Sequence, residues 1–358
     1  MRIAAMAALP PSGEYVQPKR PTKLNMIDLF SGPGGNSYAF RDFTNTRLYC
    51  ENAAPARLAL RANMKSGLID AAPVHSDVRT LLDSKAYAEA KAHRPLLVSG
   101  SWPCQGNSTA GKMQGMWDDR SALLIDLCAV ILDSEADIFF MENVPGAATN
   151  ESYDYIYIKL AAKYVIRDDI IGAAQLGFPH VRKRFFCVGV RKGFDLFGLR
   201  FGGAERLAPG ARQEPPRGRA NEPARYKSSW KHLGNAVVPA ASFYAFVTLL
   251  GVARAGSMHV FKPYAGPPLW LDPDAYTPPR RVTPRDLTSP PINKPFRMDL
   301  WPTPRAGCYG ASHTLSYRST RDLASAVRFE KATPNKQRAF VNLDWLKWLM
   351  GYPAAWNC

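Results

Sequence analysis

Short apolar segments that end abruptly in polar residues recur through the first half of the chain. The clearest are DLF before SGPGG at residues 28–35, YC before EN at 49–52, HS before DV at 75–78, SGS before WPCQ at 99–105 and FFM before ENV at 139–144. Apolar runs of this length, bounded by turn residues, are typical of buried strands. In parallel sheets flanked by helices, ligands bind beyond the carboxyl ends of the strands. The polar ends therefore predict a binding site at one edge of such a sheet.

Segments with helical spacing lie between these strands. They cover residues 55–64, 86–94, 121–135 and 155–164, and a further strand, RFFCVGVRK, follows at 184–192. Strands that alternate with helices favour an α/β fold with a mostly parallel sheet and helices on both faces.

Composition divides the chain into successive parts. Residues 1–23 form a polar leader that we expect to be flexible and basic, and residues 24–191 form the main α/β domain. Residues 192–225 are rich in Gly, Pro and Arg and predict a short, mobile, basic loop. Residues 226–255 contain a Gly-Asn turn and an apolar helix that complete the main domain. Residues 256–358 begin as a proline-dense arm and end in an aromatic, basic tail, which predicts a small irregular region.

The charge balance is strongly basic. The chain has 358 residues, with 46 Lys and Arg against 30 Asp and Glu, and a formal net charge of +16. Such an excess favours a polyanionic partner, most often nucleic acid, because Lys and Arg displace counterions from phosphates. The alternative is that the charge serves solubility alone.

The cysteines and the hydropathy of the sequence indicate in which cellular compartment the protein is expected. The six cysteines are not clustered and include no CxxC pair, so neither a disulfide framework nor a metal site is predicted. Reduced thiols favour a cytoplasmic protein. Pro10 and Pro11 interrupt the apolar stretch near the N-terminus, and no run approaches the roughly 18 apolar residues that a membrane helix needs. We therefore expect a soluble protein without a membrane partner.

The turn after the first strand and two acidic residues suggest a nucleoside site. Gly32, Gly34 and Gly35 allow the backbone to approach a nucleotide-like ligand closely. The turn lacks both the GxGxxG pattern and a Walker lysine, so phosphate binding is not predicted. Glu51 is placed to accept hydrogen bonds from ribose hydroxyls, and Asp77 to meet an adenine amino group. The alternative for the glycines is a tight turn without a ligand.

Cys104 is the candidate nucleophile. It follows Pro103 at the mouth of a strand, whereas a structural cysteine usually lies within an apolar run. A thiolate is the best side-chain nucleophile near neutral pH. Glu142 supplies a carboxylate at the end of a neighbouring strand, and Arg182 and Arg184 are expected on one face of a strand. The alternatives are a cap or salt bridge for Glu142 and edge-strand charges for the arginines.

These motifs resemble, in the same order, those of the DNA (cytosine-5) methyltransferases. DLFSGPGG is similar to the cofactor turn of that family, GSWPCQGNS to its nucleophile loop, ENV to its catalytic carboxylate motif, FPHVRKR to its QxRxR strand and LGNAVVP to its late GNAV segment. The resemblance covers roughly residues 24–250. It implies a Rossmann-like class I S-adenosylmethionine-dependent methyltransferase fold with a mostly parallel seven-stranded sheet. Residues 24–191 would then carry catalysis and cofactor binding.

The resemblance also implies a reaction. Cys104 would add to C6 of a cytosine, Glu142 would hydrogen-bond and protonate N3, and Arg184 would hold O2. C5 would then take the methyl group of S-adenosylmethionine, and loss of the C5 proton would release the thiol. The cytosine must leave the helix stack, so base flipping of double-stranded DNA is expected. Arg182 belongs to the same catalytic set.

Further residues follow from the resemblance, and among them Asn235 is expected to steady the closed site. The expected cofactor-binding residues are Asp28, Phe30, Ser31, Gly32, Gly34, Gly35, Glu51, Asn52, Asp77, Val78, Pro103, Asn235 and Ala236. The expected DNA-binding residues are Gln105, Ser108, Lys112, Arg120 and Arg305.

The sequence departs from the family pattern in its details. Asn52 and Ala53 stand where the family has a large apolar side chain on adenine, which leaves a modified relative of S-adenosylmethionine as an alternative cofactor. His180 replaces the leading Gln of QxRxR. The gap between VRKRFF and LGNAV holds only a short loop where the family has its target-recognition domain, so residues 256–358 are expected to take that role.

The tail is similar to those of phage and prophage methyltransferases in the segments LWPTPRA and LDWLKWLMGYP. We expect the final helix, with Trp345, Leu346 and Leu349, to pack on the catalytic domain. The Arg-rich segments before it are expected to contact DNA.

Alternatives to an active DNA cytosine-C5 methyltransferase stay open. One is a substrate other than DNA, either RNA or a free nucleotide, although the charge of +16 argues against a free nucleotide. Another is a non-catalytic DNA-binding protein, which would need none of Cys104, Glu142, Arg182 and Arg184. A third is transfer of a group other than methyl. We expect a monomer in a bacterial or phage-infected cytoplasm, with a cognate restriction endonuclease as a candidate partner.

Overall fold

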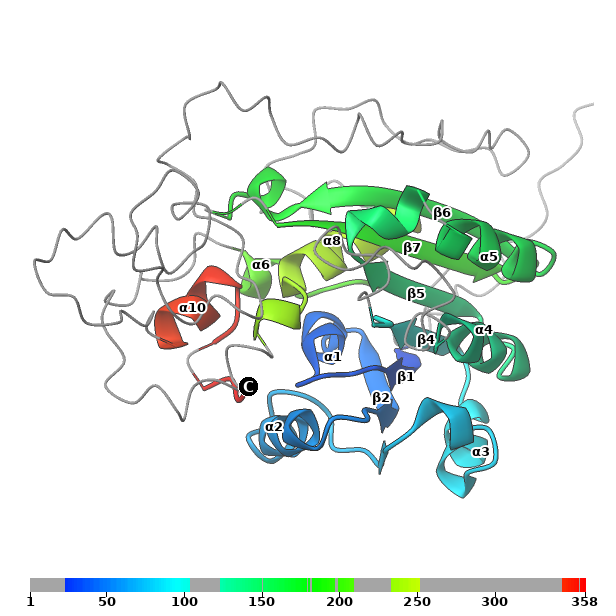
Figure 1. Ribbon diagram of the computed structural model, residues 1–358, viewed down its shortest axis with the longest axis horizontal. Coiled ribbons are helices and arrows are strands. Elements are labelled where there is room, and N and C mark those ends of the chain that lie inside the picture. The colour runs from blue at the N-terminus through cyan, green and yellow to red at the C-terminus, as the bar shows by residue number, and fades with distance from the viewer. Residues whose placement is uncertain are drawn as a thin grey trace, which may run out of the picture.

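Seven strands form one sheet in the order β3-β2-β1-β4-β5-β7-β6 (Figure 1). The computed structural model describes residues 23–103, 123–149, 151–178, 180, 182–196, 199–208, 233–251, 343–353 and 355–358. The strands are β1 (Leu24–Leu29), β2 (Thr44–Cys50), β3 (Val74–His75), β4 (Leu96–Gly100), β5 (Ile138–Asn143), β6 (Tyr164–Gly172) and β7 (Lys183–Arg191). Neighbours pair in parallel except β7, which runs antiparallel to β5 and β6. The predicted mostly parallel α/β sheet is confirmed.

The strand register brings the polar strand ends to one edge of the sheet. Leu29 at the end of β1 pairs with Cys50 of β2 and with Gly100 of β4. Gly100 in turn pairs with Met141, one residue before Glu142. Because β7 is antiparallel, its first residues lie at this same edge.

The strand β6 was not predicted from the sequence. Its segment YVIRDDIIG contains adjacent charged residues that interrupt the apolar alternation. In the structure the Asp168 carboxylate accepts a hydrogen bond from the Tyr153 hydroxyl at 3.1 Å. Burial raises the pKa of Asp168 to about 6. A tertiary contact therefore accommodates the charge that obscured the strand.

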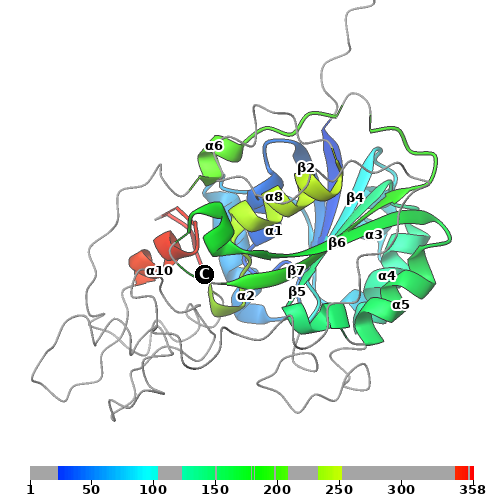
Figure 2. The same cartoon turned by 90° about the horizontal axis from the view of Figure 1, so that it is seen from above.

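Helices cover both faces of the sheet (Figure 2). One face lies against α1 and α8, and the other against α3, α4 and α5. The helices are α1 (Gly35–Phe40), α2 (Ala54–Lys65), α3 (Lys85–Lys91), α4 (Leu123–Asp133), α5 (Glu151–Leu160), α6 (Ala204–Leu207), α8 (Pro239–Leu249) and α10 (Leu343–Leu349). Short 3-10 turns are η1 (Val78–Thr80), η3 (Pro145–Thr149) and η4 (Ala173–Leu176).

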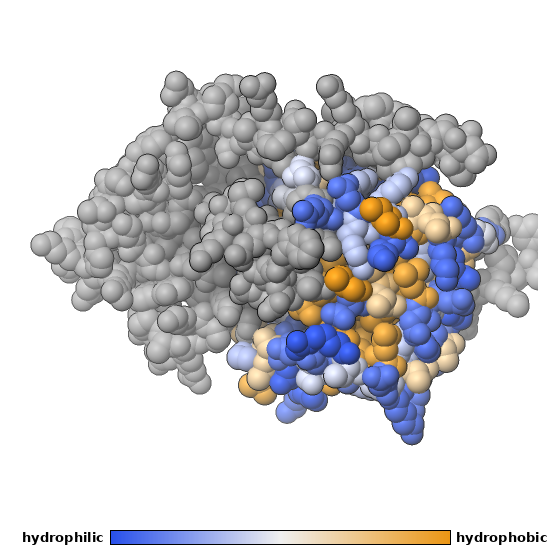
Figure 3. Space-filling model, turned by 45° about the vertical axis from the view of Figure 1, so that its right-hand side comes forward, coloured by the Kyte–Doolittle hydropathy of each residue, from blue (hydrophilic) through white to orange (hydrophobic). Residues whose placement is uncertain are grey.

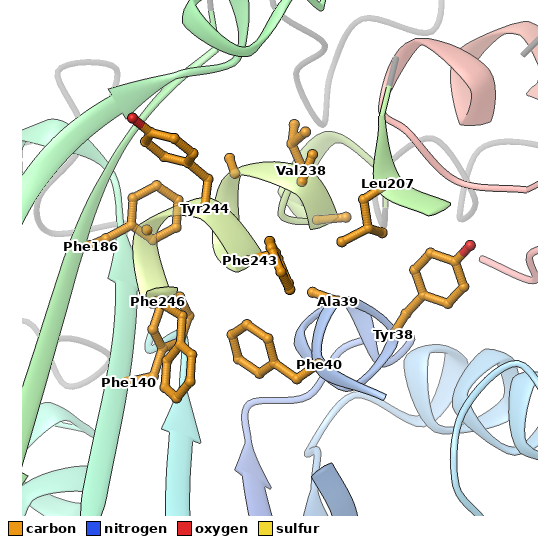
Figure 4. Packing of buried hydrophobic residues seen from close by; sticks show 14 of the residues in the cluster. Tyr38, Ala39, Phe40, Phe140, Phe186, Leu207, Val238, Phe243, Tyr244 and Phe246 are labelled. Carbon is orange, nitrogen blue, oxygen red and sulfur yellow. The ribbon is translucent and has the colours of Figure 1, made fainter. Parts of the chain in front are cut away.

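An aromatic cluster holds α1 and α8 on the sheet (Figure 4). The ring of Phe40 lies edge-on to Phe140 of β5, with ring centroids 5.1 Å apart, and 5.0 Å from the ring of Phe246 of α8. Contacts of this kind add to the stabilisation from area burial alone. They fix α1, and with it the glycine-rich turn that precedes this helix.

The C-terminal segment packs against the same core. Leu346 and Leu349 of α10 are completely buried there, which confirms the predicted packing for these two residues. Beyond α10, the rings of Tyr352 and Trp356 stack with centroids 4.6 Å apart, and Trp356 lies edge-on to Tyr38 of α1. Residues 343–353 and 355–358 therefore pack on the α1 face of the sheet.

The loop predicted for residues 192–225 is partly structured. It contains α6, whose Ala204 and Leu207 are buried. The Arg206 guanidinium forms a 2.8 Å ion pair with Asp42. This part of the predicted loop is thus a short helix with buried side chains, held by an ion pair. The leader at 1–22 and residues 209–225 lie outside the described part of the chain.

The described surface mixes polar and apolar side chains, and on the face shown in Figure 3 hydrophobic residues lie among hydrophilic neighbours. No helix within the described residues is long and apolar enough to cross a membrane. Over the same residues, no group of three or more His, Cys, Asp or Glu side chains is placed to hold a metal ion.

Candidate active site

The turn after β1 adopts a backbone that glycine favours. Phe30 has φ 54°, Gly32 φ 55° and Gly34 φ 95°, all in the left-handed region where side chains other than glycine are strained. A Cβ on Gly34 would lie 2.6 Å from Cδ1 of Ile69, whereas a Cβ on Gly32 would meet no atom within 4 Å. The turn is therefore packed against Ile69 at Gly34 and has open space beside Gly32.

Glu51 holds this turn from the end of β2. Its Oε2 accepts a hydrogen bond from the Gly32 N–H at 2.8 Å, and its Oε1 accepts one from the Ala53 N–H at 2.8 Å. The side chain is half-buried, and each carboxylate oxygen has further acceptor capacity. The carboxylate is thus fixed beside the turn, where ribose hydroxyls were predicted to bind. Asn52 is exposed.

Asp28, at the end of β1, is buried against α1. Its side chain is 1% exposed, and its Oδ2 accepts a hydrogen bond from the Ser37 hydroxyl of α1 at 2.9 Å. Burial raises its pKa to about 7. Ser31 is also buried, and its hydroxyl donates to the Asp28 carbonyl at 2.6 Å. The Asp28 side chain thus bonds α1, which covers that face of β1, and its part in cofactor binding stays a prediction.

Asp77 caps the 3-10 turn η1 that follows β3. Its Oδ1 accepts a hydrogen bond from the Arg79 N–H at 3.1 Å, and its Oδ2 lies 2.6 Å from Nη2 of the Arg79 guanidinium. These bonds lower the pKa of Asp77. Val78, the next residue, is buried in the core under α4. Asp77 is thus an ionised acceptor at the strand-end edge of the sheet.

Two asparagines hold the base of the loop that carries Cys104. The base consists of Ser101, Trp102 and Pro103, which follow β4. Asn143, next to Glu142, donates through Nδ2 to the Trp102 carbonyl at 3.1 Å. Asn36, the second residue of α1, donates through Nδ2 to the Ser101 hydroxyl at 3.3 Å. The predicted site residues outside the described part of the chain are Cys104, Gln105, Ser108, Lys112, Arg120 and Arg305.

Glu142 and Arg184 form an ion pair at the same edge. Glu142 lies opposite Phe186 in the antiparallel β5–β7 register, so Arg184 is its diagonal neighbour on the same face. The Arg184 Nε lies 3.0 Å from Glu142 Oε1, and the two side chains are 17% and 6% exposed. One carboxylate oxygen is thereby oriented by the guanidinium. The other is able to share a proton with a ring nitrogen.

Arg182 occupies a different environment from Arg184. It directly precedes β7, which begins at Lys183, so the strand itself does not include it. Its side chain is 1% exposed, and its Nη2 donates to the carbonyls of Gly234 at 3.0 Å and Ala236 at 2.6 Å. Arg182 therefore fixes the turn before α8 from inside the protein.

The remaining predicted residues lie around this turn. Asn235 is exposed and Ala236 is buried. His180 is completely buried, and its Nε2 lies 3.0 Å from the carbonyl oxygen of Leu349 in α10. Burial, together with the positive charge of Arg182, lowers the pKa of His180 to about 3, so the ring is neutral. The family pattern has Gln at this position. Here a neutral histidine bonds the backbone of α10 instead.

The sequence interpretation missed three asparagines: Asn36, Asn63 and Asn143. Asn36 and Asn143 hold the loop base. Asn63 of α2 donates to the Pro33 carbonyl in the turn and to the Asn357 carbonyl beyond α10. The position of Asn36 directly after the glycines, and of Asn143 inside ENV, was an available signal. The pairing of Asn63 with Asn357 has no local signal.

The fold and the site define a class of protein. A seven-stranded sheet with an antiparallel β7, a glycine-rich turn after β1 and a carboxylate at the end of β2 are the arrangement of the class I S-adenosylmethionine-dependent methyltransferases. The model of the C-5 cytosine-specific DNA methylases matches residues 24–239, which is more than half of the chain. The chain belongs to this family.

Three curated relatives are type II methyltransferases. M.AquIA of Picosynechococcus sp. is 32% identical over 184 residues, which cover 47% of this chain and 72% of that protein. M.HgiDI of Herpetosiphon aurantiacus is 30% identical over 173 residues, covering 48% of this chain and 53% of that protein. M.HpaII of Haemophilus parainfluenzae is 29% identical over 180 residues, covering 48% and 47%. The chain therefore spans most of the first relative and about half the length of the other two.

Proposed function

We propose that the protein is a DNA cytosine-C5 methyltransferase that uses S-adenosylmethionine and forms a covalent adduct between Cys104 and C6 of a flipped cytosine. The ion pair of Glu142 and Arg184 carries this proposal. The Glu142 carboxylate is nearly buried, and the Arg184 guanidinium orients it at the edge where β1, β2 and β4 also end. A carboxyl group held in this way is suited to give a proton to a neutral heterocycle during the reaction. A purely DNA-binding protein has no use for such a pair.

The residues around the glycine turn fit a nucleoside cofactor. Gly32 is open to close approach, and the Glu51 carboxylate, fixed by two backbone N–H groups, retains acceptor capacity for ribose hydroxyls. Asp77 lies at the end of β3 as an acceptor for an adenine amino group. When bound, S-adenosylmethionine supplies an electrophilic methyl group. The exposed Asn52 leaves the outer side of that site polar.

The protein residues then carry the steps on the base. The Cys104 thiolate forms a bond to C6, and the electrons of the C5–C6 double bond move toward C5 as Glu142 protonates N3. Arg184 orients Glu142 and holds O2. After C5 has gained the methyl group, loss of the C5 proton to a base restores the double bond and expels the thiolate. Arg182 contributes indirectly, because it fixes the turn at Gly234–Ala236.

Double-stranded DNA is the proposed substrate. The net charge of +16 suits a polyanion, and a cytosine inside a duplex reaches a nucleophile only after it has been flipped out. We place the DNA-recognition role in residues 256–342 and assign the protein to the cytoplasm as a monomer. Because its relatives are type II methyltransferases, a cognate restriction endonuclease is the partner to test for.

The decisive experiment is mass spectrometry of nucleosides from unmodified DNA after incubation with the protein and S-adenosylmethionine. We expect 5-methylcytosine from the wild type and none from Cys104→Ser. RNA is tested in parallel. Folded wild-type protein that binds DNA but methylates neither nucleic acid would contradict the proposal, as would methylation that survives in Cys104→Ser.

A further inference from the structure

Asn36 joins three segments that lie far apart in the sequence. It is the second residue of α1, directly after the glycine turn, and its side chain is 6% exposed. Its Nδ2 donates to the Ser101 hydroxyl at 3.3 Å, and its Oδ1 accepts from the Ser242 hydroxyl of α8 at 3.0 Å. One amide therefore links the cofactor turn, the base of the Cys104 loop and α8.

The orientation of this amide is determined by its partners. Ser242 is completely buried, and its hydroxyl donates to the Asn36 oxygen. With its oxygen accepting from Ser242, the amide turns its nitrogen toward Ser101 and donates to that hydroxyl. The Ser101 hydroxyl is held as an acceptor, three residues before Cys104.

The loop base is held on both sides. Asn36 bonds the Ser101 side chain from α1, and Asn143 bonds the Trp102 carbonyl from β5 at 3.1 Å. Asn143 adjoins Glu142. Two consecutive residues of the loop base are thus tied to the turn that is proposed to bind the cofactor and to the strand that carries the carboxylate.

We propose that Asn36 is a positioning residue for Cys104, setting the loop base so that the thiolate reaches C6 while C5 faces the methyl donor. This inference rests on the proposed function. The physical reason is alignment: a displacement of about 1 Å at a reacting atom costs on the order of 100-fold in rate. Because Asn143 holds the base independently, loss of Asn36 alone is expected to lower kcat about tenfold.

The test compares Asn36→Ala with a matched control, Asn25→Ala. Asn25 is equally buried, at 6% exposure, but its amide donates to the Arg94 carbonyl at the opposite end of β1. We expect Asn36→Ala to lower kcat about tenfold, with a smaller change in the dissociation constant for S-adenosylmethionine. We expect Asn25→Ala to lower the melting temperature by a similar amount and to leave kcat unchanged.

A second readout follows the thiol itself. With fluorine at C5 of the cytosines in the DNA, the methylated adduct has no C5 proton to lose, so the bond between Cys104 and C6 persists. Denaturing electrophoresis then gives the rate of covalent capture. We expect this rate to fall in Asn36→Ala by about the same factor as kcat. A role in stability alone would not change the capture rate of the folded fraction.

A double-mutant cycle with Ser101→Ala completes the test. If the two side chains act through their shared hydrogen bond, Ser101→Ala slows capture, Ser101→Thr restores it, and the double variant is no slower than Asn36→Ala. Because Ser101→Ala removes a single hydroxyl, it serves even where Asn36→Ala fails to fold. Additive effects, or capture in Ser101→Ala at the wild-type rate, would overturn the inference. Absence of capture in the wild type would instead contradict the proposed function.

Discussion

The Arg184 guanidinium lies 3.0 Å from the Glu142 carboxylate, measured from Nε to Oε1, and both side chains are largely buried. The two residues come from antiparallel strands and meet as diagonal neighbours on one face of the sheet. Removing water from such a pair strengthens its electrostatic interaction and fixes the direction of the second carboxylate oxygen. This geometry suits proton transfer at a defined atom of a bound ring.

Glu142→Gln tests that proton transfer. The amide retains the size of the side chain and is able to accept from Arg184, but it cannot deliver a proton to N3. We expect kcat to fall by roughly 10²- to 10⁴-fold, while DNA binding in gel-shift assays stays near the wild-type level. Single-turnover methylation measures the effect. A variant with near-normal kcat would exclude Glu142 as the acid.

Arg182→Ala tests the buried link to the turn before α8. Loss of the guanidinium leaves the carbonyls of Gly234 and Ala236 without their donor inside the protein, so we expect the free energy of unfolding to fall by about 2–4 kcal/mol. The adjacent Lys183, which is exposed, provides the matched control Lys183→Ala, with an expected change below about 0.5 kcal/mol. Chemical denaturation measures both. Equal effects in the two variants would show that the buried contact adds no stability.

Local sequence patterns predicted part of the fold correctly. The strand ends, the glycine turn and the helices α4, α5 and α8 follow from apolar periodicity and turn residues, and the register then brings Glu51, Asp77 and Glu142 to one edge. Alternation along β1 separates two faces but does not say which helix covers each, so the bond between Asp28 and Ser37 of α1 was not predicted. Arg182 was assigned to a strand that begins one residue later.

Contacts between distant segments were beyond local patterns. The sequence holds no sign that Leu349 would lie against His180, or that Trp356 would lie against Tyr38 of α1. The strand β6 was missed for a related reason, because Asp168 is accommodated only through its bond to Tyr153. These features depend on contacts between residues far apart in the chain, and a short window of sequence does not show such contacts.

Asp28→Asn tests the pH dependence of stability. Burial raises the pKa of Asp28 from 3.8 to about 7 in the folded protein. The folded state therefore binds this proton more tightly than the unfolded state, so the contribution to stability is present below pH 3.8 and is lost as the pH rises toward 7. Between pH 5 and pH 8 we expect the wild type to lose about 3 kcal/mol relative to Asp28→Asn.

The measurement for Asp28 is urea unfolding of both proteins at a series of pH values. The control is Asp83→Asn, which removes the same formal charge at an exposed position and should run parallel to the wild type. If the difference between wild type and Asp28→Asn stays constant from pH 5 to pH 8, Asp28 does not titrate in that range.

Asn63→Ala tests whether the C-terminal residues support the cofactor turn. The Asn63 side chain is completely buried. Its Nδ2 donates to the Pro33 carbonyl at 3.0 Å and to the Asn357 carbonyl at 2.9 Å, and its Oδ1 accepts from the Asn357 N–H at 2.8 Å. Alanine removes the partners of the buried Pro33 carbonyl and of the half-buried Asn357 backbone, so we expect a loss of about 2–4 kcal/mol in the free energy of unfolding.

The affinity for S-adenosylmethionine shows whether Asn63 shapes the turn or only stabilises the domain. Because Asn63 bonds the turn at Pro33, we expect isothermal titration of folded Asn63→Ala at low temperature to show weaker binding of S-adenosylmethionine. Asn45→Ala, a half-buried position on β2, should bind as the wild type does. If Asn63→Ala is destabilised but binds with unchanged affinity, the C-terminal residues stabilise the domain without shaping the turn. Because Asn357 is joined to Pro33 through one side chain, we expect the affinity to fall together with the stability.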